Sequence, residues 1–161
     1  MRIILASHNR GKLREIRDLL AGLDVDWVSL SDIDGPPAVV EDGGTFYENA
    51  LKKALAVAQY TQCTALADDS GLEVDALGGA PGIHSARYAG DGADDLKNME
   101  KLLQELEGVP PERRQAAFRC VLVLCQPDGR HEAFEGRWEG RISEVMRGRR
   151  GFGYDPVFYL E

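Results

Sequence analysis

The sequence predicts an α/β fold, with a mixed, twisted central sheet flanked by helices, as a single domain over residues 1–161. Short apolar runs of strand length alternate with segments of helical periodicity through the first two thirds of the chain. Two later apolar runs flank a Pro-Asp-Gly turn, which predicts an antiparallel hairpin. With 161 residues, 43% of them hydrophobic, the chain is long enough to bury a core, and loops at the strand ends are expected to form a cleft.

The first half of the chain opens with a strand expected at Ile3–Ala6. Apolar residues then recur at helical spacing from Leu13 to a stop near Gly22, which predicts the first helix. A second helix is expected to begin at Thr45, because Thr45 and Glu48 have the spacing of a capping box.

The next strand is expected at Thr64–Ala67 and carries two adjacent carboxylates, Asp68 and Asp69, at its end. Ser70-Gly71 is expected to end the strand, since both residue types favour turns. Side chains alternate along extended backbone, so the two aspartates project to opposite sides and only one faces a given cleft. Taken alone, the run fits a solvated turn equally well, and its surroundings must decide.

The second half of the chain predicts one helix and a hairpin. Apolar positions from Leu96 to Leu106 mark a helix that ends before Pro110-Pro111. Ala117–Cys125 and His131–Arg137 are expected as paired strands joined by a turn at Pro127-Asp128-Gly129.

Composition excludes several classes of protein. The net charge of −8 argues against binding a nucleic acid polymer, which needs a basic face. The three cysteines are odd in number and lack Cys-x-x-Cys spacing, so reduced thiols in a cytoplasmic protein are expected. No apolar run reaches membrane-spanning length, and we expect no membrane partner.

The loop before the first helix, Ser7-His8-Asn9-Arg10-Gly11-Lys12, has the character of a phosphate site. Unpaired N–H groups and the dipole at a helix start favour an anion, and Arg10 and Lys12 add positive charge. The Walker A pattern is absent. An ordinary strand-to-helix turn with solvated basic side chains is the alternative interpretation, and His8 fits either.

Acidic residues also precede the second helix, in Glu41-Asp42-Gly43-Gly44. Magnesium prefers one or two carboxylates together with substrate phosphate oxygens and waters. Glu41 and Asp69 are therefore candidate ligands, whereas Asp42 or Asp68 can instead be surface charge.

A third loop, Gly151-Phe152-Gly153-Tyr154-Asp155-Pro156, combines aromatic rings, glycines and a carboxylate. Such a set can stack a nucleobase on a ring and hydrogen-bond its edge. The alternative is a buried aromatic turn that closes the core, which is the commoner use of aromatic side chains.

Five motifs follow one another over almost the whole chain. They are Ser7-x-Asn9-x-Gly11-Lys12-x-x-Glu15, Glu41-x-Gly43-x-Thr45-Phe46-x-Glu48-Asn49-Ala50, Ala67-Asp68-Asp69-Ser70-Gly71-Leu72, Gly78-Gly79-x-Pro81-Gly82-x-x-Ser85-Ala86-Arg87 and Gly151-Phe152-Gly153-Tyr154-Asp155-Pro156. In this order they resemble the Ham1/RdgB family, the inosine triphosphate pyrophosphatase group.

The resemblance implies an ITPase-like fold of two lobes with the active-site cleft between them. It implies hydrolysis of non-standard purine nucleoside triphosphates (ITP, dITP, XTP) to the monophosphate and pyrophosphate, which removes deaminated purines from the nucleotide pool. Mg²⁺ is the implied cofactor, and the implied assembly is a homodimer.

Residue roles carry over by motif. Asp69 would be the catalytic acid–base residue and a magnesium ligand, Glu41 a second ligand, and Ser70 a substrate contact. The phosphates would be held by Ser7, His8, Asn9, Arg10, Gly11 and Lys12. The nucleotide would be bound by Phe152, Gly153, Tyr154 and Asp155, with Phe152 stacking on the base.

The sequence departs from the family pattern at its end. The pattern continues with a substrate-contacting lysine and a Ser-His-Arg motif on C-terminal segments, whereas this sequence stops at Glu161. We therefore expect a domain without that segment, and an alternative function follows: a nucleotide-binding module with weak or no turnover.

Overall fold

The computed structural model describes residues 1–148 and 151–160, which group into two compact units. Unit 1 comprises Met1–Asp69 and Val121–Glu135, and unit 2 comprises Ser70–Cys120 and Gly136–Glu161. Three long strands contribute residues to both units: β3 (Thr64–Val74), β4 (Gln115–Cys125) and β5 (His131–Ile142).

The strands form one mixed sheet in the order β2-β1-β3-β4-β5-β6. Strand β1 (Arg2–Leu5) runs parallel to both β2 (Asp26–Ser29) and β3, and β6 (Phe158–Tyr159) runs antiparallel to β5. A tight turn joins β4 to β5, with the N–H of Gly129 donating to the carbonyl of Gln126 at 2.9 Å. The predicted mixed α/β fold and the predicted hairpin are both confirmed.

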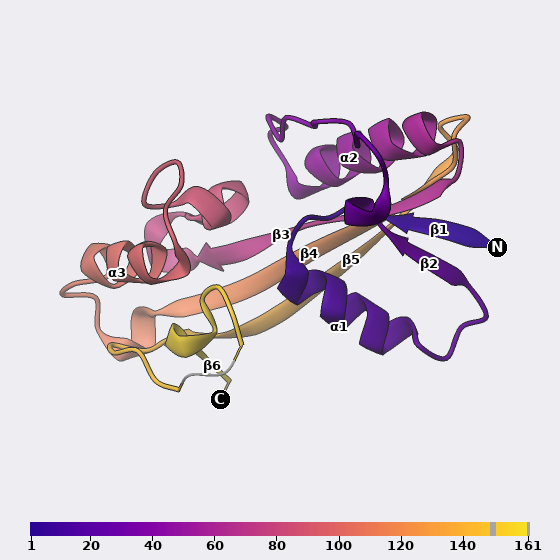
Figure 1. Ribbon diagram of the computed structural model, residues 1–161. Helices are drawn as coiled ribbons and strands as arrows, with labels where there is room; N and C mark the ends of the chain where they lie inside the picture. The colour runs from indigo at the N-terminus through magenta and orange to yellow at the C-terminus, as the bar shows by residue number, and fades with distance from the viewer. Residues whose placement is uncertain (149–150, 161) are drawn as a thin grey trace. The chain divides into compact units, whose positions relative to one another are not determined.

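In unit 1, helices α1 (Arg10–Leu20) and α2 (Phe46–Thr61) lie on opposite faces of β1 and β3, as Figure 1 shows. On the α1 side, the predicted apolar stripe of the helix packs against alternate residues of the strands; this cluster includes Leu13, Ile16, Leu20, Ile3, Leu5 and Leu66. On the other side, α2 buries mostly small side chains: Phe46, Asn49, Ala50, Ala54, Val57 and Ala58. Small residues let a helix lie close to the sheet, and Asn49 is the one polar member of this buried set.

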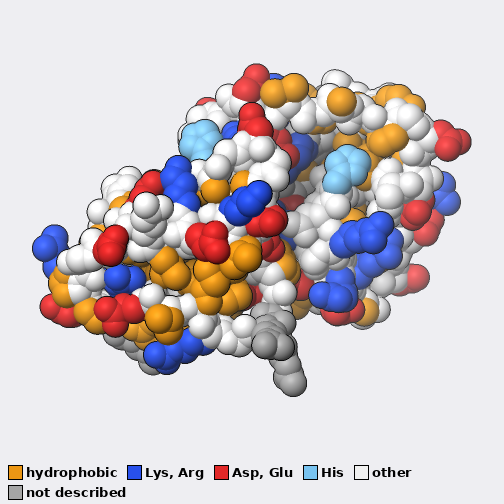
Figure 2. Space-filling model, turned by 60° about the vertical axis from the view of Figure 1, so that its left-hand side comes forward, with side chains coloured by type: hydrophobic (Ala, Val, Ile, Leu, Met, Phe, Trp, Pro, Cys, Tyr) orange, Lys and Arg blue, Asp and Glu red, His pale blue; other side chains and the backbone are white. Residues whose placement is uncertain are grey.

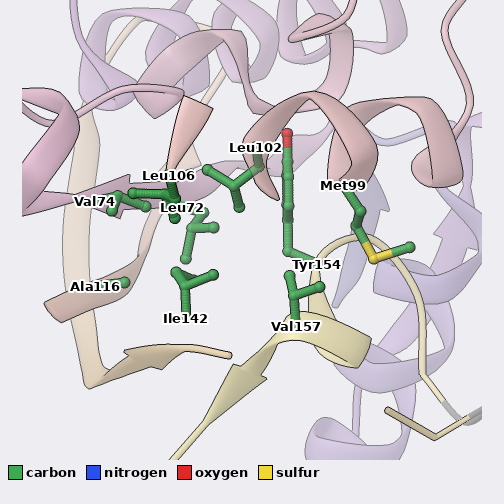
Figure 3. Close-up of a cluster of buried hydrophobic side chains, with 9 residues drawn as sticks. All are labelled: Leu72, Val74, Met99, Leu102, Leu106, Ala116, Ile142, Tyr154 and Val157. Atoms are coloured by element: carbon green, nitrogen blue, oxygen red, sulfur yellow. The ribbon is translucent and has the colours of Figure 1, made fainter. Parts of the chain in front are cut away.

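Unit 2 has its own apolar core beneath α3 (Asp95–Glu105), a helix that the sequence predicts and that Asp94 caps. Figure 3 shows this core, which comprises Leu72, Val74, Met99, Leu102, Leu106, Ala116, Ile142, Tyr154 and Val157. Short 3-10 helices connect the longer elements at Leu30–Asp32, Asp75–Leu77, Gly82–Arg87, Pro111–Arg113 and Asp155–Val157.

Strand β3 corrects the expected position of the paired aspartates. The strand does not end at Ser70-Gly71 but continues to Val74, so Asp68 and Asp69 lie inside it. The turn preference of Ser and Gly is weak compared with burial of the flanking residues, and Leu72 and Val74 are both fully buried. The two carboxylates are consequently held on regular, buried backbone rather than in a solvated turn.

Other elements also differ from expectation. Strand β5, expected at His131–Arg137, continues to Ile142. Helix α1 begins at Arg10, because Asn9 caps it, so half of the predicted loop belongs to the first helical turn. The helix ends at Leu20 with Ala21 as its C-cap, which confirms the predicted stop near Gly22. Strand β2 was not predicted at all, since its four residues begin with Asp26 and end with Ser29 and give no clear alternation.

Two further findings concern the cysteines and the length of the helices. Cys63, Cys120 and Cys125 are not joined by disulfide bonds. Within residues 1–148 and 151–160, no helix combines the length and apolar character needed to cross a membrane.

Candidate active site

Asp69 is a buried carboxylate on the α2 side of unit 1, with 7% of its surface exposed. Its Oδ2 accepts a hydrogen bond of 3.0 Å from Nδ2 of Asn49. Burial raises the pKa of Asp69 above its ordinary range; the Asn49 hydrogen bond and the charges of Lys53 and Lys12 oppose this rise, and the charge of Glu41 adds to it. A carboxyl group with a raised pKa is better matched to proton transfer near neutral pH than an ordinary aspartate.

Asp68 lies on the opposite side of β3 and pairs with α1. Its Oδ2 is 2.6 Å from Nζ of Lys12, and the two side chains are 4% and 22% exposed, respectively. The alternation expected for adjacent strand residues thus separates the two carboxylates: Asp68 is the ion-pair partner of Lys12, and Asp69 contacts α2.

The acidic loop Glu41–Gly44 is docked on the first turns of α2. The N–H groups of Gly43 and Gly44 donate to Oδ1 of Asn49 at 2.8 Å and to Oε2 of Glu48 at 2.6 Å. Glu41 pairs with Lys53, with Oε2 and Nζ 3.2 Å apart. These contacts hold Glu41 near enough to Asp69 for its charge to affect the Asp69 carboxyl.

The predicted capping box at α2 is present in modified form. Oγ1 of Thr45 accepts from the N–H of Glu48 at 3.1 Å, as predicted. The carboxylate of Glu48, however, binds the N–H of Gly44 instead of returning to that of Thr45. The cap therefore also fixes the backbone of the acidic loop.

The predicted phosphate loop is split between the start of α1 and the residues before it. Oδ1 of Asn9 accepts from the N–H groups of Gly11 and Lys12, at 2.9 and 3.1 Å, and Oγ of Ser7 accepts from the N–H of Asn9 at 3.2 Å. Two of the N–H groups expected to meet an anion are therefore bound by the cap. Positive charge at this end of the helix comes from the side chains of Lys12 and the exposed Arg10.

Arg10 also borders a surface hollow of about 320 Å³ beside α1. His8, two residues before Arg10 in the chain, is exposed. The hollow is lined by Arg10, Leu13, Arg14, Arg17, Asp18, Ser29, Ser31 and Asp32. On the face of the molecule seen in Figure 2, basic and acidic side chains are interspersed and do not form one continuous basic surface.

The glycine-rich aromatic loop belongs to unit 2 and is tied down at several points. Oδ2 of Asp155 accepts from the N–H of Phe152 at 3.0 Å, and the N–H of Gly153 donates to Oδ2 of Asp95 at 2.8 Å. At Gly151, where φ is +86°, an added Cβ would lie 2.1 Å from the Asp155 carboxylate. Glycine is therefore required at that position.

Within this loop, Tyr154 and Phe152 differ in environment. Tyr154 is buried, and its hydroxyl donates to the carbonyl of Ser85 at 2.7 Å. Figure 3 shows its ring among the core side chains between Leu102 and Val157. Tyr154 thus fits the alternative that the sequence left open for this loop, in which an aromatic side chain closes the core. Phe152 is only half-buried, and Asp155 is exposed.

Ser70 follows Asp69 in β3 and is half-buried. Two residues near Asp69 were missed as site residues from the sequence, namely Asn49 and Lys53. Their spacing of four places them on the same face of α2, and an asparagine on the alanine-rich face of the predicted helix was the sequence signal available.

The fold and site together define a class: a mixed α/β protein in which three carboxylates and two lysines share one region, a set that suits a polyanionic ligand when a divalent cation lies between them. The Ham1 family profile matches residues 3–161. The chain belongs to the Ham1 family.

Named relatives agree with this assignment. The chain is 52% identical to the dITP/XTP pyrophosphatase of Desulforamulus reducens over 160 residues and 54% identical to that of Geobacter sulfurreducens over 159 residues. Each match covers 99% of this chain and 80% of the relative. Among solved structures, a Ham1 protein from Coxiella burnetii has a TM-score of 0.90 at 42% identity, covering 99% of this chain and 82% of that one. The Staphylococcus aureus Ham1 protein has a TM-score of 0.87 at 42% identity, covering 99% and 81%, respectively.

Proposed function

We propose that this chain hydrolyses non-standard purine nucleoside triphosphates such as dITP, ITP and XTP to the nucleoside monophosphate and pyrophosphate. The observation that carries the proposal is the environment of Asp69, a buried carboxyl group with a raised pKa near Lys12, Lys53 and Glu41. The names of the curated relatives support the same activity, so nucleotide binding without turnover is not favoured.

The residues of unit 1 account for the chemistry. In the ionised state, Asp69 accepts a proton from the water that attacks the α-phosphorus, and the leaving group is pyrophosphate. Lys12 and Lys53 carry the positive charge that stabilises charge developing on the phosphate oxygens. Ser7 and the residues up to Lys12 bind the phosphates.

Magnesium fits the carboxylates present. The described residues contain no group of three or more His, Cys, Asp and Glu side chains arranged for a metal. Magnesium, however, needs only one or two carboxylates when phosphate oxygens and waters supply its other ligands, and Glu41 and Asp69 provide that pair. When bound, the ion would offset the negative charge that repels a nucleophile from the triphosphate.

Base recognition is assigned to the loop of unit 2. Phe152 offers a half-buried ring for stacking, and Ser70, Gly153 and Asp155 offer polar groups for the nucleotide. Donors that pair with a 6-oxo group and are left unsatisfied by a 6-amino group would discriminate deaminated purines from adenine.

The resemblance also supports a homodimer that acts in the cytoplasm. Light scattering coupled to size-exclusion chromatography tests the dimer directly. A mass equal to one chain at micromolar concentration would contradict it.

The activity is tested by pyrophosphate release from dITP, ITP, XTP, ATP and GTP, with magnesium and with EDTA. We expect the deaminated purines to be preferred, no turnover in EDTA, and a loss of about 10²–10⁴-fold in Asp69→Asn. Asp42→Asn is the matched control, because Asp42 is an exposed carboxylate paired with Lys52, 2.5 Å away. Equal rates on all five substrates, or full activity in Asp69→Asn, refute the proposal; tight ITP binding without turnover supports the binding-module alternative.

A further inference from the structure

Asn49 is the buried polar residue of α2, with 1% of its surface exposed. Its side chain makes two hydrogen bonds: Oδ1 accepts from the N–H of Gly43 at 2.8 Å, and Nδ2 donates to Oδ2 of Asp69 at 3.0 Å. A backbone N–H can only donate, so the atom facing Gly43 must be the amide oxygen and the atom facing Asp69 must be the amide nitrogen. The orientation of the Asn49 amide is therefore fixed by its partners.

This amide joins the two acidic segments of unit 1. On one side it holds an oxygen of Asp69 and thereby limits rotation of that carboxylate; on the other it holds the backbone of the loop that carries Glu41. The approach is close, since a Cβ added to Gly43 would lie 2.7 Å from Oδ1 of Asn49. Only glycine at position 43 allows the loop to reach the amide.

From this arrangement we infer that Asn49 is a positioning residue for the proposed hydrolysis, which sets the direction of the Asp69 carboxylate and its separation from Glu41. The inference rests on the proposed function. It assigns no contact between Asn49 and the substrate, because Asn49 acts through Asp69 and through the Glu41 loop.

A purely structural role would need no carboxylate partner, and unit 2 contains such a case. Asn98 in α3 is also buried, at 2% exposed. Its Oδ1 accepts from the N–H of Ala89 at 2.8 Å, and its Nδ2 donates to the carbonyl of Ala86 at 3.2 Å. The two asparagines thus match in burial and hydrogen-bonding pattern, but only Asn49 has a candidate catalytic group as its acceptor.

The first test compares Asn49→Asp with Asn98→Asp in the full chain. Each substitution keeps the side-chain shape and the acceptor for the backbone N–H but replaces the amide donor with an oxygen. At position 49 the new oxygen would face Oδ2 of Asp69, and the carboxylate would turn away. Since small misplacements of a reacting group cost about a hundredfold in rate, we expect kcat for ITP to fall about a hundredfold in Asn49→Asp with KM changed less than threefold. In Asn98→Asp, kcat should stay within threefold of the wild type.

The second test is independent of activity and uses the exchange Asn49→Asp/Asp69→Asn. The exchange restores one donor and one acceptor between the two positions, with their direction reversed. Urea denaturation gives the unfolding equilibrium constants of the wild type, the two single variants and the double variant. We expect the double variant to be more stable than the two single effects together predict, by at least tenfold in the unfolding equilibrium constant. Turnover should not return, because Asp69 is absent.

The outcomes separate the inference from the proposed function. If wild-type chain releases no pyrophosphate from any nucleotide, the proposed function and the role of Asn49 both fall. If the wild type is active and Asn49→Asp keeps its kcat, or loses no more than Asn98→Asp, the inference alone is overturned. Coupling below twofold in the exchange would likewise overturn it, because the contact between Asn49 and Asp69 would then not exist in solution.

Discussion

The ion pair between Lys12 and Asp68 gives the sharpest prediction, because its two members differ greatly in burial. Their charged atoms are 2.6 Å apart, but the Asp68 side chain is 4% exposed and that of Lys12 is 22% exposed. Removing the lysine leaves a buried, uncompensated carboxylate. Removing the aspartate charge leaves an ammonium group that can still reach water.

The expected magnitudes follow from this asymmetry. Stranding a buried charge costs about 3–5 kcal/mol of unfolding free energy, so Lys12→Met should lose that amount at pH 7. Asp68→Asn keeps an acceptor for Lys12 and should lose about 1 kcal/mol. The double variant Lys12→Met/Asp68→Asn removes the stranded charge, and we expect it to regain about 2 kcal/mol or more relative to Lys12→Met.

Urea denaturation of the four proteins measures these differences, and nucleotide kinetics add a second readout. A charged hydrogen bond to phosphate contributes about 1.5–3 kcal/mol, so KM for ITP should stay raised about 10–150-fold in the double variant although its stability recovers. Lys52→Met is the control: its pair with Asp42 is 2.5 Å long but exposed (46% and 66%), and its loss should cost less than about 1 kcal/mol. Equal losses in Lys12→Met and Asp68→Asn would refute the burial argument, and an unchanged KM would remove Lys12 from phosphate binding.

Four further predictions concern Asp69, Arg114 and Tyr154. Because the pKa of Asp69 is raised by burial, kcat should fall as the pH drops through a pKa above the ordinary aspartate range, and Asp69→Asn should lack this limb of the pH–rate profile. The sign for stability is opposite to that of a salt-bridged aspartate, because the charged form of Asp69 destabilises the fold above its raised pKa. Asp69→Asn should therefore be more stable than wild type at pH 7, with the difference vanishing below about pH 4, the unfolded aspartate pKa. Arg114 is buried and donates hydrogen bonds to three backbone carbonyls, at 2.8, 2.9 and 3.2 Å. Arg114→Met should therefore lower the free energy of unfolding, measured by urea denaturation, by about 3–5 kcal/mol. The control is Arg113→Met, at an exposed neighbouring position, which should change it by less than about 0.5 kcal/mol. Tyr154→Phe removes the hydrogen bond to the carbonyl of Ser85 and should lower the free energy of unfolding by about 1–2 kcal/mol, as measured by thermal unfolding. KM for ITP should change less than threefold. A tenfold rise in KM would instead show that the hydroxyl contacts the substrate.

Local signals predicted the elements whose causes are local. Helix α2 begins where Thr45 can cap it, α3 follows an uninterrupted apolar periodicity, and the β4–β5 hairpin turns at Gly129, whose φ is +88°. The length of β3 could not be predicted in this way. Ser70-Gly71 has the composition of a turn, but the burial of Leu72 and Val74 keeps the backbone extended.

The candidate site shows the same division. Asp69 is a candidate from its motif alone, whereas the contacts of Asn49 with Asp69 and of Lys53 with Glu41 are known only from the packing of α2 on β3 and of the Glu41 loop on α2. Asp68 had no assigned role until its contact with Lys12 was known. Each of these pairs joins residues far apart in the chain, and no local pattern encodes their distance.

The sequence by itself determined the mixed α/β class, the starts of the main helices, the hairpin and the family resemblance, and it gave Asp69 as the candidate catalytic residue, which stays a prediction. Capping, periodicity and turn chemistry act within a few residues, and so they can be read along the chain. Only the tertiary structure decided that Asp68 and Asp69 lie inside a strand, that Lys12 neutralises one while Asn49 holds the other, and that Tyr154 is part of the core. Burial and charge pairing arise from segments brought together by folding, and these contacts determine which of the two adjacent aspartates has a raised pKa and is therefore the one proposed for catalysis.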